Sequence, residues 1–249
     1  MEALMILLGL ITGSFINVCI HRLPRGESVV TYPSHCPGCK TRLGFLDLVP
    51  LLGYMLLRGR CRYCGVKISP RYPAVELLTA SVFLLTYLNV GLTPALVKYL
   101  FLFSVLLVVS FIDLDHQVIP NSLVLVILAW GAAWQIFWPE ISWTGALGGA
   151  LLGGGFLLAL AVVSRGGMGG GDIKLMFAAG FYLGPLLTSV TLFVGFISGT
   201  LVGLALIVLK LKSRQEYIPF GPFLCLGVFL AVLWGQDLFE AYMGITGLG

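Results

Sequence analysis

Residues 166–175, GGMGGGDIKL, place one carboxylate among five glycines, between two long apolar runs. An ionisable side chain in such a setting is costly, and Asp172 is therefore a candidate functional group. Bare glycine backbone lets a second peptide backbone lie extended against catalytic groups. We therefore interpret Gly169 and Gly171 as residues that shape the site. Lys174 is a candidate to bias the nearby acid or to contact lipid headgroups.

A second acid, Asp113, directly follows an apolar run in VVSFIDLDHQVIPN, and Asp115 is its alternative two residues further on. Two carboxylates brought together share a proton, because both cannot ionise cheaply. Such a pair can hydrolyse a peptide: the ionised member takes a proton from water, and the protonated member polarises the scissile carbonyl. Taken singly, Asp113 or Asp172 could instead be a helix-end residue, as Gly-x-Gly-Asp alone is weak evidence. Together they predict a catalytic pair.

Residues 36–64 contain two C-x-x-C pairs, separated by 21 residues. The four thiols are those of Cys36, Cys39, Cys61 and Cys64. Four thiolates turned toward one point form a closed tetrahedral zinc site, and so the spacing predicts a structural zinc ion. Two structural disulfides are the alternative, which a reducing compartment disfavours. We expect Cys19 and Cys225 to be ordinary small apolar residues.

The elements that must position these groups are membrane helices. The chain has 249 residues, of which 58% are hydrophobic and 10% charged, whereas soluble domains have about 25% charged residues. A spanning helix needs about 20 mostly apolar residues. Eight runs qualify, namely 3–20, 73–91, 95–113, 121–138, 144–164, 172–188, 189–210 and 219–243. In the sixth, which is short, GFYLGPLL is expected to form a bend or a turn.

The distribution of basic residues predicts the orientation of these helices. Lysine and arginine favour the cytoplasmic side, and nine of the 15 basic residues lie in residues 21–72, beside only two acids. With eight spans, the basic turns at 165–174 and 210–214 fall on that same side, together with both candidate aspartates. The sequence therefore predicts an all-α polytopic membrane protein with three parts: a first helix (1–21), a cytoplasmic zinc-binding module (22–72) and a membrane core (73–249).

Several ordered motifs together resemble the type IV prepilin peptidase family of Gly-x-Gly-Asp membrane aspartyl proteases. The motifs are GSFINVCIHRLP (13–24), CPGC with LRGRCRYCGVKISPRYPAVE (36–76), FIDLDHQVIPN (111–121), GGMGGGDIKL (166–175) and YIPFGPFL (217–224). Position by position, the resemblance implies Asp113 and Asp172 as the catalytic pair. It also implies a location in the bacterial inner membrane, with the zinc module and the aspartates on the cytoplasmic side.

The tetracysteine module resembles that of the bifunctional branch of this family. The resemblance implies cleavage of prepilin or pseudopilin leaders after a glycine at the cytoplasmic face. It further implies N-methylation of the new terminus with S-adenosylmethionine. Glu76, which follows RYPAV, is a candidate to contact substrate or cofactor, although an acid near a helix start is also favoured by the helix dipole.

Two other functions are compatible with membrane carboxylates. A presenilin-type intramembrane protease also uses Gly-x-Gly-Asp, but it would have no reason to carry the tetracysteine loop. A transporter of protons or metal ions would place polar groups near mid-membrane, often at broken helices. The expected partners are the substrate helix and membrane lipid, and no nucleic acid. The sequence leaves the oligomeric state open.

Overall fold

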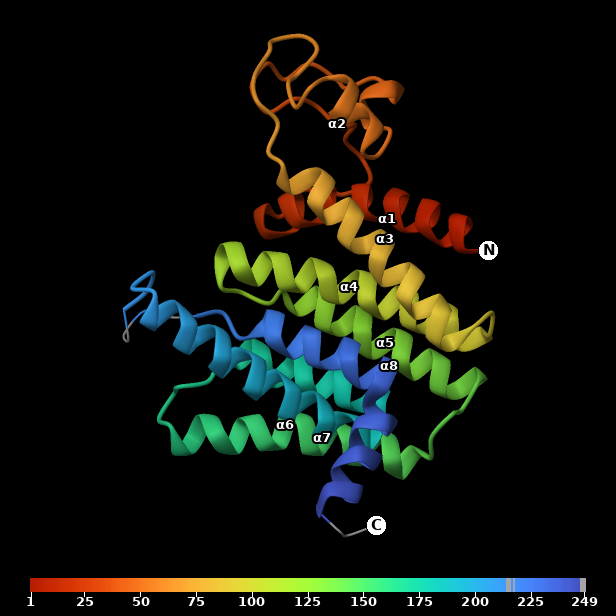
Figure 1. Ribbon diagram of the computed structural model, residues 1–249, viewed down its shortest axis with the longest axis vertical. Helices are drawn as coiled ribbons and strands as arrows, with labels where there is room; N and C mark the ends of the chain where they lie inside the picture. The colour runs from red at the N-terminus through yellow and green to blue at the C-terminus, as the bar shows by residue number, and fades with distance from the viewer. Residues whose placement is uncertain (214–215, 217, 247–249) are drawn as a thin grey trace. The chain divides into compact units, whose positions relative to one another are not determined.

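The fold is all-helical in the computed structural model shown in Figure 1, which describes residues 1–213, 216 and 218–246. Its helices are α1 (Glu2–Arg22), η1 (Leu23–Arg25), η2 (Phe45–Leu48), α2 (Leu52–Leu56), α3 (Arg71–Val90), α4 (Pro94–His116), α5 (Asn121–Phe137), α6 (Trp143–Val163), α7 (Gly170–Val208) and α8 (Gly221–Thr246). The predicted fold class is confirmed. Arg214 of the predicted basic turn and Tyr217 of YIPFGPFL lie outside the described residues.

Six helices in the described part of the chain are long and apolar enough to cross a membrane, and α5 is a shorter apolar helix. The predicted spans 172–188 and 189–210 correspond to the two helical segments of α7, which meet at a kink without a loop between them. The backbone of α7 leaves helical geometry at Gly184 (φ 72°), and Pro185 follows. A left-handed glycine followed by a proline interrupts the helical hydrogen-bond ladder. The bend expected in GFYLGPLL is therefore confirmed, at Gly184.

The chain divides into two compact units, residues 1–108 and 109–249, and the division falls inside α4. The first unit holds α1, the cysteine module and α3, and the second holds α5 to α8. Both candidate aspartates belong to the second unit. The predicted division of the chain at residues 21 and 72 stays a prediction.

In the first unit, α1 and α3 pack against each other as an antiparallel pair through small residues. A Cβ at Gly9 would lie 2.5 Å from the Ala80 Cα, and one at Gly13 would lie 2.7 Å from the Glu76 Cα. Glycines four residues apart occupy one helix face and let two backbones approach closely, as in membrane helix pairs. The GLITG run of α1 therefore serves helix packing.

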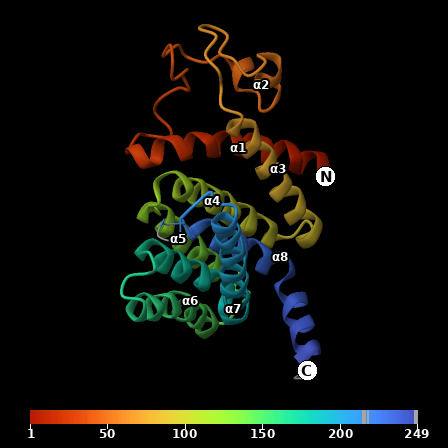
Figure 2. The same ribbon diagram turned by 60° about the vertical axis from the view of Figure 1, so that its left-hand side comes forward.

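In the second unit, α6 and α7 lie side by side in both views (Figures 1 and 2). A Cβ at Gly149 would overlap the Gly180 carbonyl oxygen, and one at Gly153 would lie 2.5 Å from the Met176 carbonyl oxygen. The run GALGGALLGGG, at residues 145–155, is thus helix packing, as its small residues predict. This pairing fixes the first part of α7, which begins with the candidate site.

Gly149→Ala is expected to destabilise the second unit by about 1–3 kcal/mol, because a methyl group has no space between the two backbones. Gly155→Ala is the matched control on the same helix, since no atom lies within 4 Å of a Cβ there. The control should be neutral or stabilising by up to about 1 kcal/mol. Thermal unfolding in detergent, followed by circular dichroism, measures both. Equal midpoints for the two variants would contradict the packing described here.

Candidate active site and metal centre

Asp113 and Asp172 come from the ends of two different helices and are buried together. Asp113 lies in the last turn of α4, and Asp172 lies in the first turn of α7. Each is only 3% exposed. Their carboxyl groups are close enough to repel each other electrostatically. Asp115, the alternative first acid, is exposed. The structure therefore brings together the two acids on which the sequence-based hypothesis depends.

The glycine-rich loop leads into the first turn of α7, which carries Asp172. Gly169 is the N-cap residue of α7 and has extended backbone (φ −69°, ψ 138°). Asp172 is the third residue of α7. The positive end of the helix dipole favours a carboxylate at this position. The helix start thus gives the acid a favourable electrostatic environment.

The start of α8 contributes a backbone donor that the sequence did not reveal as part of the site. The Gly221 N–H group donates to Asp113 Oδ2 at 3.0 Å, across 108 positions of the chain. A Cβ at Gly221 would lie 2.7 Å from the same oxygen. The available signal was the Pro-Phe-Gly-Pro pattern at residues 219–222, because it marks a helix that begins abruptly.

Cys225 is buried in the core, 6% exposed, as expected of a small apolar residue, and it lies near the two acids. Its thiol interacts electrostatically with Asp113 and Asp172 and is hydrogen-bonded to Ser110. Cys225 follows Gly221 by one helical turn, and Ser110 precedes Asp113 by three residues, so both lie on the faces that carry the site. These spacings are the sequence signal for the position of Cys225 near the acids.

The other predicted site-shaping residues have specific neighbours. A Cβ at Gly171 would lie 3.0 Å from the Ile119 Cβ, so this glycine permits packing against the loop before α5. At Gly170, by contrast, no atom lies within 4 Å of a Cβ. Open backbone beside Asp172 is therefore found at Gly170. The exposed Lys174 donates to Asn121 Oδ1 at 3.2 Å, which links the first turns of α7 and α5.

Glu76 is a buried tether in the first unit. It is 7% exposed, and its Oε2 accepts a hydrogen bond of 2.8 Å from the Leu51 N–H group. Leu51 has φ 59°, a conformation that is uncommon for a leucine, and the hydrogen bond supports it. The carboxylate of Glu76 thus attaches the cysteine module to the second turn of α3. Asn17 of α1 similarly donates to the Tyr72 carbonyl oxygen at 3.0 Å.

The four cysteines of the module converge on one point. Their sulfur atoms all lie within 4.8 Å of one another, and the Cys36 and Cys64 sulfurs are 3.8 Å apart. Four sulfurs at 2.3 Å from a tetrahedral zinc ion lie about 3.8 Å from one another. All four thiols are free, so the disulfide alternative is not what the structure contains. This geometry fits a tetrahedral metal ion.

The two cysteine pairs have the same backbone geometry. The Lys40 N–H group donates to the Cys36 carbonyl oxygen, and the Gly65 N–H group donates to the Cys61 carbonyl oxygen, both at 2.9 Å. Lys40 and Gly65 occupy the equivalent position in each turn and have positive φ values of 59° and 71°. The module is therefore built from two copies of one cysteine turn.

Hydrogen bonds lower the pKa of two of the four thiols, which favours the thiolate form that binds a metal. Hydrogen bonds from Thr41 lower the pKa of the Cys39 thiol to about 6. The backbone N–H of Cys64 is the main cause that lowers the pKa of Cys61. The Val66 N–H acts in the same direction at Cys64, but desolvation and the neighbouring sulfurs outweigh it and raise the pKa of that thiol to about 12. A bound cation must replace this proton, and metal affinity therefore falls as the pH falls.

Comparisons with known proteins cover nearly the whole chain. The Bacterial Peptidase A24 N-terminal domain matches residues 7–90, and the Type IV leader peptidase family matches residues 100–204. The prepilin leader peptidase/N-methyltransferase of Bacillus subtilis (strain 168) is 33% identical over 243 residues, 98% of each chain. The proteins of the same name from Aeromonas hydrophila and Legionella pneumophila are 33% and 34% identical. These matches cover 97% and 96% of this chain and 93% of each relative. No solved structure matches the chain.

Proposed function

The chain belongs to the type IV leader peptidase family, and we propose on this premise that it is a bifunctional prepilin leader peptidase and N-methyltransferase. It removes the leader peptide of type IV prepilins or pseudopilins and then methylates the new N-terminus. The near end-to-end match to relatives of that name favours this function over a presenilin-type protease or an ion transporter. The protein is a multi-pass membrane protein.

The observation that carries the peptidase proposal is the burial of two interacting carboxyl groups from α4 and α7, beside the Gly221 N–H group. One carboxyl is ionised and takes a proton from the attacking water, whose oxygen adds to the scissile carbonyl carbon. The other is protonated and donates a hydrogen bond to the carbonyl oxygen. Collapse of the tetrahedral species breaks the C–N bond, and the leaving amine receives a proton. Gly221 N–H holds Asp113 in place through these steps.

We assign the carboxyl pair and the cysteine module to the cytoplasmic side, with cleavage after a glycine at that membrane face. The concentration of basic residues at 21–72 supports this orientation. The backbone beside Asp172 is open at Gly170, which supports an extended peptide as the substrate at this point. Gly169 and Gly171 shape the loop around the acid, while Lys174 and Glu76 act as tethers.

Zinc is the metal that we propose for the four cysteines, because tetrahedral sulfur coordination is typical of structural zinc sites. All four positions are protein ligands, so no coordination position remains for water or substrate. The metal therefore has a structural role, and the peptidase step needs only the carboxyl pair. For the methyltransferase step, S-adenosylmethionine is the methyl-donor substrate, and its sulfonium supplies an activated methyl group.

Purified full-length protein in lipid nanodiscs, given a prepilin substrate, tests both activities separately. Mass spectrometry of the product distinguishes the intact prepilin, the cleaved N-terminus and the methylated N-terminus. We expect cleavage without added methyl donor and methylation only when S-adenosylmethionine is present. Cleavage with no methyl transfer under any condition would leave the peptidase assignment intact and overturn the methyltransferase assignment.

Gly221→Ala is expected to reduce the cleavage rate by about 10²-fold, because a Cβ would lie 2.7 Å from Asp113 Oδ2 and displace the carboxyl group. Gly244→Ala, on the same helix, is the matched control, since nothing lies within 4 Å of a Cβ there. Steady-state kinetics should show a loss in kcat with little change in KM. If Gly221→Ala had the kcat of the wild type, the hydrogen bond from the Gly221 N–H group to Asp113 would have no role in the mechanism.

A further inference from the structure

A groove of about 460 Å³ lies in the first unit, where the second cysteine turn meets α3. We call it the basic groove, and its main lining residues are Tyr54, Arg58, Arg60, Lys67, Ser69 and Pro70. Three of its side chains are cationic, and no carboxylate lines it. A concave site with one sign of charge concentrates ions of the opposite sign. The groove is therefore suited to an anion.

The three cations have no charge partner within the described part of the chain. Residues 22–72 contain only two acids, Glu27 and Asp47. The carboxylate of Asp47 already has other partners, because it accepts hydrogen bonds from Arg62 Nε at 2.8 Å and from the Gly44 N–H group at 3.1 Å. The guanidinium and ammonium groups of the basic groove are exposed. These exposed cations are therefore available to an anionic ligand from outside the module.

The groove lies at the end of a membrane span. Pro70, one of its lining residues, is the N-cap of α3, and α3 is a candidate span that begins at Arg71. The hydrogen bond between Leu51 and Glu76 also holds the start of α2 against the second turn of that span. The groove is thus fixed at the boundary between the membrane and water, where phospholipid headgroups lie.

Exposed apolar side chains accompany the cations. On α2, which carries Tyr54, the side chains of Leu52, Met55 and Leu56 are 57%, 69% and 76% exposed. A soluble anion such as inorganic phosphate would leave them in water. A phospholipid places its acyl chains next to its phosphate, and so it can cover the apolar side chains and neutralise the cations together. This combination favours a lipid over a free anion.

We propose that the basic groove binds the phosphate of an anionic phospholipid, and that Leu52, Met55 and Leu56 contact the acyl region beside it. Phosphatidylglycerol fits because it carries a net negative charge. Phosphatidylcholine fits less well, because its ammonium group meets Arg58, Arg60 and Lys67 at close range. Each cation near an anionic membrane surface contributes about fivefold to binding. This lipid site holds the cysteine module on the membrane and is independent of both proposed catalytic activities.

Site-directed photo-crosslinking in the full-length protein tests the proposal. Tyr54 is replaced by the aromatic photo-crosslinker p-benzoylphenylalanine, and the same replacement at Tyr63, exposed but outside the groove, is the control. The protein is placed in nanodiscs of phosphatidylcholine with or without phosphatidylglycerol, and mass spectrometry identifies the adduct. We expect phosphatidylglycerol adducts at position 54, enriched well above that lipid's share of the bilayer.

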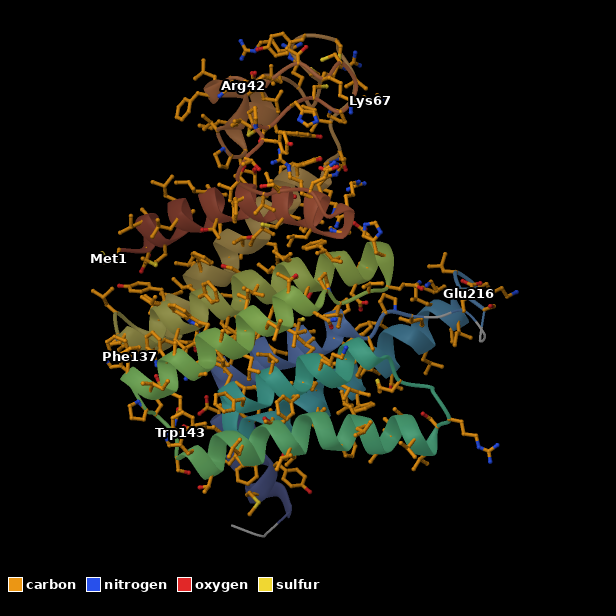
Figure 3. All side chains as sticks on the ribbon, turned by 180° about the vertical axis from the view of Figure 1, so that it is seen from behind. Met1, Arg42, Lys67, Phe137, Trp143 and Glu216 are labelled. Carbon is orange, nitrogen blue, oxygen red and sulfur yellow. The ribbon has the colours of Figure 1, made fainter. Side chains whose placement is uncertain are left out.

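The repeated cysteine turn supplies a matched pair of charge variants. Arg60 and Lys67 face each other across the second turn, as His35 and Arg42 do across the first (Figure 3 labels Arg42 and Lys67). Arg60→Gln with Lys67→Gln should lower the phosphatidylglycerol adduct by about fivefold for each cation removed. Lys67→Gln and Arg42→Gln alone each remove one positive charge and form the matched comparison: the first should lower the adduct about fivefold and the second should leave it unchanged. The metal content of every variant verifies that the module is folded.

Three results would overturn the proposal. Equal labelling of the two lipids would show that the groove does not recognise negative charge. Loss of the adduct on addition of inorganic phosphate or S-adenosylmethionine would make the groove a site for that soluble compound instead. Crosslinks from position 54 to protein, whether this chain or a second copy, would show that a protein surface covers the groove.

Discussion

Asp172→Asn and Asp113→Asn are each expected to reduce leader cleavage by roughly 10²–10⁴-fold while the helices stay assembled. An amide can neither take the proton of the attacking water nor donate as an acid to the scissile carbonyl. The fold should persist because asparagine has nearly the size of aspartate and keeps a side-chain oxygen, which at position 113 can still accept from the Gly221 N–H. Each substitution also removes the repulsion between the two carboxyl groups.

Asp115→Asn is the matched control for this prediction. Asp115 lies two residues from Asp113 on the same helix but is exposed, so its loss should leave cleavage within about twofold of wild type. Cleavage is followed by mass spectrometry of the prepilin product in nanodiscs, and folding by circular dichroism. Normal cleavage by either variant at 113 or 172 would refute the carboxyl pair as the catalytic machinery.

Cys36→Ser with Cys61→Ser is expected to abolish metal binding and to unfold the cysteine module. One ligand is lost from each turn, and the two remaining thiols cannot form a closed tetrahedral site. Structural zinc sites contribute about 10–16 kcal/mol of apparent binding free energy, which is far more than a module of this size gains from its own core. We expect methyl transfer to fall more than cleavage, because the carboxyl pair belongs to the other compact unit.

The measurement is the zinc-to-protein ratio by elemental analysis, together with limited proteolysis of residues 22–72. Cys19→Ala is the control, since Cys19 is buried in α1 and is not among the four converging thiols. It should retain one zinc ion per chain and the wild-type proteolytic pattern. Absence of zinc from the native protein, or wild-type zinc content in the double variant, would contradict the assignment of these ligands.

The sequence by itself determined the elements and the chemistry that they carry. Hydropathy runs long enough to cross a membrane identified α1, α3, α4, α6 and α8, because the number of residues needed to cross a bilayer is a local property. Gly184 and Pro185 marked the bend of α7. Glycine allows a left-handed backbone conformation and proline removes a backbone N–H donor, and both effects act at the residue's own position. The two C-x-x-C pairs likewise identified their own ligand set.

The tertiary structure alone decided which distant groups meet. The Gly221 N–H group reaches Asp113 across 108 positions, and Glu76 accepts from Leu51 across 25. No local pattern in hydropathy or charge encodes such a meeting, because it depends on how whole helices pack. For the same reason the sequence could indicate that glycines serve close approach, but not that Gly171 approaches Ile119 while Gly170 stays open. The helices could be predicted because they depend on residues that are adjacent in the sequence. The contacts of the site could not, because they join residues that are distant in the sequence and meet only when the helices pack.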